Sequence, residues 1–165
     1  MEHYLRSAAI AILLLLVQTT FMPFVALGGI LPDLFILWLV YIAVRRGQIE
    51  AMLTGFGAGL LQDVVSTKFF GLAVLSKTVS SFAAGYFFNE NTAEQTLGSY
   101  RYLSIVGLCS LLHNLIYFVI FLQGTEGPWL SSLVILCLST TLYTVVVSVI
   151  PMFAFSQKFS TSWAQ

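Results

Sequence analysis

The sequence predicts an all-α integral membrane protein in which a single domain over residues 1–165 contains six transmembrane helices. Two observations indicate this fold class. Of the 165 residues, 58% are hydrophobic and only 8% are charged, whereas soluble domains carry about 25% charged residues. A spanning helix needs about 20 apolar residues, so six helices use about 120 residues and leave no room for a second, soluble domain.

Hydrophobic runs bounded by charged residues, proline or glycine define the six spans. The first run contains four consecutive leucines, the second lies between Pro32-Asp33 and Arg45-Arg46, and the third is short and rich in glycine. We predict spans over residues 7–27, 32–46, 51–65, 69–88, 102–122 and 129–155. A signal peptide cleaved near residues 26–28 is an alternative for the first run, and it also leaves the N-terminus cytoplasmic.

The distribution of lysine and arginine predicts that both termini are cytoplasmic, because basic residues are enriched on that side of a membrane. With six alternating spans, five basic residues share one side: Arg6, Arg45, Arg46, Arg101 and Lys158. Only Lys68 flanks a span on the other side, together with Asp33, Glu126 and Trp129. The longest loop, over residues 89–100, is then cytoplasmic, and it is too short to fold alone.

Composition and motifs argue against catalysis and against several kinds of binding. Seven basic and seven acidic residues give no net charge, so no basic surface for nucleic acid is expected. Cys109 and Cys137 lie far apart in apolar runs and form no disulfide or zinc pattern. His113 is the only histidine inside a predicted span, and no G-x-S-x-G surrounds a serine. We expect no enzyme, no metal and no cofactor.

Two ionisable residues inside the predicted spans suggest a structural ion pair. Asp63 lies near the outer end of the third span, and Lys77 lies about two turns into the fourth. Because the lysine side chain can extend toward the membrane surface, we predict an Asp63–Lys77 pair between these helices. The alternatives are that each side chain reaches water separately, or that both belong to a proton relay, which usually needs more titratable groups.

The fifth span carries a polar stripe made of Ser110, His113, Asn114 and Tyr117, which are spaced three or four residues apart. This stripe either donates hydrogen bonds to a neighbouring helix or binds a small ligand. Helix packing is favoured, because the sixth span offers suitable partners. These partners are Ser139, Thr140, Thr141, Tyr143 and Thr144.

Small residues at a spacing of four occur on the third and fourth spans, as Gly55-x-x-x-Gly59 and Ser81-x-x-x-Gly85. Such pairs allow a neighbouring helix to approach closely. The neighbour can be another span of this chain or a helix of a separate protein. Pro32 and Asp33 are typical of a helix start, so no chemistry is expected at Asp33.

An ordered series of short motifs resembles the MreD family, the rod shape-determining membrane proteins of bacteria. The series consists of Leu31-Pro32-Asp33-Leu34, Arg45-Arg46, Gly55-x-x-x-Gly59-Leu60-Leu61-x-Asp63, Phe70-Gly71-Leu72, Leu75-Ser76-Lys77-Thr78 and Ala84-Gly85-Tyr86. It covers residues 31–86, and the hydropathy pattern extends the likeness over nearly the whole chain. No motif is matched from about Glu90 onward.

The resemblance implies a multi-pass protein of the bacterial inner membrane with no catalytic residue. It implies binding to the single-span scaffold MreC and cooperation with MreB, RodA and a class B penicillin-binding transpeptidase in peptidoglycan synthesis along the side wall. It also implies a fold like that of the substrate-binding subunits of energy-coupling-factor transporters. The positions carried over, as architectural ones, are Pro32, Asp33, Gly55, Gly59, Asp63, Gly71 and Lys77.

Two functions therefore compete. In the first, this protein is a component of the cell elongation complex, and Gly55–Gly59 or Ser81–Gly85 are candidate contacts for MreC, so that Gly59→Leu weakens MreC co-purification. In the second, the protein is a vitamin-binding subunit of an energy-coupling-factor type transporter. The second class typically has a small-residue motif on its first helix, to which only Ser7-x-x-x-Ala11 comes near.

Overall fold

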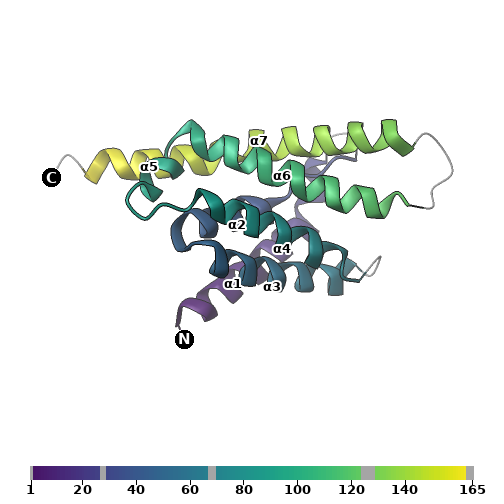
Figure 1. The fold of residues 1–165 in the computed structure, drawn as a ribbon, viewed down its shortest axis with the longest axis horizontal. Helices are drawn as coiled ribbons and strands as arrows, with labels where there is room; N and C mark the ends of the chain where they lie inside the picture. Colours follow the sequence, from purple (N-terminus) through teal and green to yellow (C-terminus); the bar gives the residue numbers. More distant parts are fainter. Residues whose placement is uncertain (1, 27–28, 67–69, 124–128, 163–165) are drawn as a thin grey trace.

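The apolar runs form helices that pack side by side, as a computed structural model shows (Figure 1). The structure describes residues 2–26, 29–66, 70–123 and 129–162. Lys68, Glu126 and the end of the signal-peptide alternative lie outside these described residues.

The described residues form seven α-helices and two 3-10 helices. In chain order they are α1 (Glu2–Thr20), η1 (Met22–Val25), α2 (Leu34–Arg46), α3 (Gln48–Ser66), α4 (Leu72–Ala84), η2 (Gly85–Phe87), α5 (Ala93–Leu97), α6 (Tyr100–Phe121) and α7 (Trp129–Ser162). The all-helical prediction is confirmed. Each predicted span overlaps one of the longer helices, but the bounds differ: α1 ends at Thr20 and not near residue 27, α3 begins at Gln48, and α7 continues to Ser162. The short helix α5 lies in the loop predicted over residues 89–100.

Two helices among the described residues are long and apolar enough to cross a membrane, namely α6 and the part of α7 over residues 129–154. In α1 the apolar part is shorter, over Ala9–Thr20. With 13 residues each, α2 and α4 are about 20 Å long, whereas the hydrocarbon core is about 30 Å thick. Six membrane crossings and the orientation of the chain therefore stay predictions.

The second helix begins and ends where the sequence indicates. Asp33 is its N-cap, and the carboxylate accepts a hydrogen bond of 2.9 Å from the amide of Phe35. At the other end Gly47 adopts a φ of 89°, a left-handed conformation that favours glycine. This residue alone separates α2 from Gln48, the first residue of α3, so the chain turns tightly at this point.

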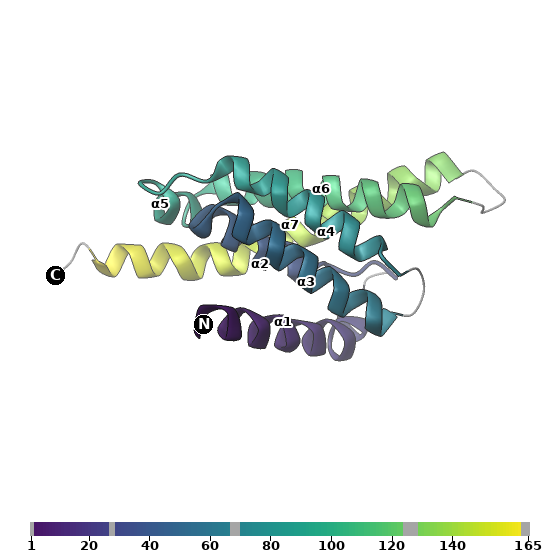
Figure 2. The same ribbon diagram turned by 60° about the horizontal axis from the view of Figure 1, so that its bottom comes forward.

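The core lies around α2, whose aliphatic and aromatic side chains are almost all buried. Helix α2 packs against α3, α4 and α6, and the Tyr102 hydroxyl of α6 donates to the carbonyl of Leu37 at 3.1 Å. Figure 2 shows α1 at the edge of the bundle, beside α3. The C-terminal part of α7 extends past the ends of the other helices (Figures 1 and 2).

Candidate functional site

A cluster of charged and titratable side chains is buried between α2, α4 and α6. We define the charged cluster as Asp33, Lys77 and His113. The Lys77 ammonium contacts a carboxylate oxygen of Asp33, Oδ2, and the Lys77 side chain is fully buried. The imidazole Nε2 of His113 lies 3.3 Å from the same oxygen. A buried charge is costly unless it is paired, so these residues satisfy one another inside the bundle.

Further contacts connect the charged cluster to the rest of the fold. The amide of Asp33 donates to the hydroxyl of Thr144 on α7 at 3.2 Å. The Lys77 ammonium lies 5.1 Å from the centre of the Phe35 ring, a cation–π distance. The start of α2 is thus joined to α4, α6 and α7 through a single residue, Asp33.

The predicted Asp63–Lys77 ion pair is wrong, because Lys77 pairs with Asp33. The Asp63 carboxylate instead accepts hydrogen bonds from three amides at the start of α4: Gly71 at 2.9 Å, Ala73 at 3.1 Å and Val74 at 3.1 Å. Asp63 therefore caps α4 from the neighbouring helix. Sequence reasoning missed this role and also the role of Asp33, which it interpreted only as a helix start.

The cap is expected to contribute measurably to stability. Replacing Asp63 with alanine leaves three amides at the start of α4 without their acceptor, so we expect a loss of about 2 kcal/mol in the free energy of unfolding. Unfolding of the purified protein in mixed detergent micelles measures this loss. Asp63→Asn, which keeps an acceptor oxygen, is expected to lose about half as much, and an equal loss for both variants would contradict the capping role.

The small residues of α3 and α4 face each other inside the bundle. A Cβ atom added at Gly55 would lie 2.4 Å from the Ser81 hydroxyl, and one added at Gly59 would lie 2.5 Å from the Cα of Val74. At Gly85 it would lie 2.4 Å from the Cα of Gln48, at the start of α3. Of the two predicted neighbours, the structure therefore shows another helix of this chain. Both small-residue pairs serve packing within the chain, and their surface is not free to bind a separate helix.

The polar stripe of α6 also faces another helix of this chain. The Asn114 side-chain amide donates to the Ser110 hydroxyl at 3.3 Å and to the Thr141 hydroxyl of α7 at 3.0 Å. Tyr117 is half-buried and its ring stacks on that of Phe121, with centroids 5.9 Å apart. In this stripe the structure favours helix packing over a ligand site, because the amide and hydroxyl groups bond to one another.

Two further predicted positions, Pro32 and Gly71, lie at the starts of helices. Pro32 is buried directly before the N-cap of α2. Gly71 adopts a φ of 98° and precedes α4, where its amide donates to Asp63. Within the described residues no group of three or more histidine, cysteine, aspartate or glutamate side chains has the geometry of a metal site.

Comparison with known proteins relates most of the chain to one family. A family model described as rod shape-determining protein MreD matches residues 4–160. No curated protein and no solved structure matches. The family match covers the motif series of residues 31–86 and extends through the second half of the chain, where no motif could be identified.

Proposed function

The chain belongs to the MreD family of rod shape-determining membrane proteins, which are not enzymes, and from this premise we propose that it binds MreC within the cell elongation complex. In this proposal the protein crosses the inner membrane six times with both termini in the cytoplasm. Through the complex it works with MreB, RodA and a class B penicillin-binding transpeptidase, and it helps to organise peptidoglycan synthesis along the side wall. The family match favours this role over that of a vitamin-binding transporter subunit.

The charged and aromatic residues at one end of the bundle support the proposed membrane placement. Arg45 at the end of α2 pairs with Glu94 of α5 at 3.3 Å, so these two segments lie at the same end. Exposed aromatic side chains accompany them at Tyr86 and Tyr100. Basic residues together with exposed tyrosines are typical of the cytoplasmic membrane interface.

The observation that carries the proposal is the exposed apolar surface of α7. The interior is filled by the apolar core around α2 and by polar and small residues that contact one another, so recognition of a partner has to use the outside. Over an apolar stretch of 18 residues, 22% of the residues of α7 are buried, against 33% over a stretch of the same length in α6. We define the α7 surface as four residues at a spacing of four that are all more than half exposed: Leu138, Leu142, Val146 and Ile150.

A single-span partner can bind along such a surface by side-by-side helix packing. The α7 surface covers 13 residues, which is about 18 Å along the helix axis and therefore more than half of the hydrocarbon thickness of about 30 Å. Its four side chains form one ridge on the helix, which suits the groove between the ridges of a partner helix. We propose that the span of MreC packs against this ridge.

Bulky substitutions on the α7 surface test the proposal. The double variant Leu142→Trp and Val146→Trp keeps the surface apolar, so insertion and folding are retained, but it changes the shape that a partner helix meets. We expect recovery of MreC with the purified protein to fall by about tenfold. When the variant replaces the native copy in a rod-shaped host, we expect the cells to become wider.

The matched control places the same change on another exposed helix face, with Leu60→Trp and Val64→Trp on α3, which are also four residues apart. This control is expected to keep MreC recovery and cell width. Unchanged MreC recovery with the α7 variant, at a normal level of folded protein, would show that MreC binds elsewhere.

A further inference from the structure

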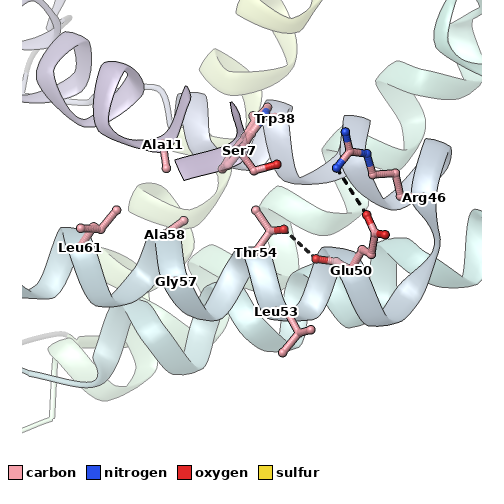
Figure 3. A pocket seen from close by; sticks show the side chains of 10 residues that line it. All are labelled: Ser7, Ala11, Trp38, Arg46, Glu50, Leu53, Thr54, Gly57, Ala58 and Leu61. Atoms are coloured by element: carbon pink, nitrogen blue, oxygen red, sulfur yellow. Dashed lines mark hydrogen bonds and ion pairs between the residues drawn. The ribbon is translucent and has the colours of Figure 1, made fainter. Parts of the chain in front are cut away.

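An open groove separates α1 from α2 and α3 near the end of the bundle at which α2 meets α3. Figure 3 shows α1 on one side of this groove and α3 on the other. Its volume is about 310 Å³, and most of its lining is small or apolar. The residues that line it include Ser7 and Ala11 of α1, Trp38 of α2, and Gly57, Ala58 and Leu61 of α3.

Gly57 differs from the other glycines of α3 in its surroundings. A Cβ atom added at Gly55 or Gly59 would collide with α4, but one added at Gly57 would meet no atom within 4 Å. The absence of a side chain at Gly57 therefore keeps the groove open and serves no contact within the described residues. In a bilayer an apolar groove of this kind is filled by a lipid chain or by a partner.

The closeness of the helices around the groove favours a lipid chain. Ala11 of α1 and Ala58 of α3 belong to one packed apolar cluster, and α1 contacts α3 directly. Because packed helices lie about 8–10 Å apart, a third helix would enter the groove only if α1 moved away from α3. An extended acyl chain is much thinner than a helix and can lie along the opening.

Two opposite charges lie at one end of the groove. They belong to Arg46, the last residue of α2, and to Glu50 in the first turn of α3, and both residues line the groove (Figure 3). The guanidinium Nη1 of Arg46 lies 3.4 Å from the carboxylate Oε2 of Glu50. Their side chains are 38% and 42% exposed. An exposed pair of this kind contributes only about 0–1 kcal/mol, so both charges can bind other groups. They lie where two helices meet at a membrane surface, whichever way the chain is oriented.

We propose that the groove binds one phosphatidylethanolamine molecule. An acyl chain lies along Ala11, Gly57 and Ala58, the phosphate contacts Arg46, and the primary ammonium donates to the carboxylate of Glu50. A headgroup with both charges complements this pair. An anionic headgroup would be repelled by Glu50, and a choline headgroup has no N–H group to donate.

Native mass spectrometry of the full chain tests this site. The protein is released from vesicles that contain equal amounts of phosphatidylethanolamine, phosphatidylcholine and phosphatidylglycerol. We expect one phosphatidylethanolamine molecule to stay bound per chain, retained about tenfold better than either other lipid. Equal retention of the three lipids would overturn the proposal.

Variants locate the site. Gly57→Phe fills the groove and is expected to lower lipid retention about tenfold, whereas Leu60→Phe, on the exposed side of the same helix, is expected to leave it unchanged. Glu50→Gln is expected to remove the preference over phosphatidylcholine. Retention by Gly57→Phe equal to that of the unmodified protein would overturn the assignment.

A second measurement covers the case in which a groove variant does not fold. In the double variant Trp129→Phe, Trp163→Phe, the single remaining tryptophan of the sequence is Trp38, and it lines the groove. Phosphatidylethanolamine with brominated acyl chains is expected to quench it more strongly than brominated phosphatidylglycerol at the same mole fraction. Equal quenching by the two brominated lipids would instead assign the groove to bulk lipid. If purified complexes that contain more MreC contain proportionally less bound lipid, the groove would instead be assigned to the partner.

Discussion

Replacing Asp33 with asparagine is expected to lower the free energy of unfolding by about 3–5 kcal/mol, because it leaves the Lys77 ammonium buried without a counter-charge. Asparagine is as good an N-cap as aspartate, so the hydrogen bond to the amide of Phe35 is kept and the loss reports the charge alone. Unfolding in mixed detergent micelles, together with the amount of protein in the membrane, measures the effect.

The double variant Asp33→Asn, Lys77→Met separates the charge from other effects. Removing both charges leaves no unpaired ion, so we expect most of the lost stability to return. Glu94→Gln is the surface control, because Glu94 pairs with Arg45 while 65% exposed, and it is expected to cost less than about 1 kcal/mol. An effect of Asp33→Asn no larger than that of Glu94→Gln would contradict a buried ion pair.

The presence of the longer helices could be predicted from the apolar runs of the sequence, and the bounds of α2 could be predicted because they are encoded locally. Pro32 and Asp33 precede α2, and Gly47 separates α2 from α3, as expected from the conformational preferences of proline and glycine. The short helix α5 was not predicted, since its five polar and apolar residues show no periodicity over a sufficient length. Its position depends on contacts with α7 and α2 that are distant in sequence.

The partners within the charged cluster could not be predicted, because periodicity gives the face of a helix but not the helix that it meets. Asp33 and Asp63 both lie near helix ends, and either could have reached Lys77. One local signal was available: Gly71 begins α4 without a side chain that could cap it. The free amides at such a helix start need an acceptor from elsewhere, and Asp63 supplies it.

The same limit applies to the small-residue pairs. A spacing of four predicts close helix contact at Gly55 and Gly59, and that contact exists, with α4 as the neighbour. Gly57 lies on the same helix but borders the open groove. In the sequence these glycines differ only in the face of the helix on which they lie. Which of these faces contacts another helix is known only when the positions of the neighbouring helices are known.

This difference in surroundings leads to a strong prediction for two substitutions that are only two residues apart. Gly59→Leu is expected to destabilise the protein by about 3 kcal/mol or more, because a Cβ atom at this position would lie 2.5 Å from the Cα of Val74 and 2.7 Å from the carbonyl oxygen of Ala73. These are backbone atoms, so no side-chain rotation relieves the contact, and α3 and α4 have to separate. Thermal unfolding in detergent measures the loss.

Gly57→Leu is the matched control, since its side chain enters open space. We expect its stability to equal or slightly exceed that of the unmodified protein, because leucine favours helix by about 1 kcal/mol over glycine. For Gly59→Leu, recovery of MreC per folded molecule is expected to stay unchanged, even though less folded protein is present. A normal melting temperature combined with loss of MreC would show instead that Gly59 lies in the interface with the partner, and that α3 and α4 do not pack in this register.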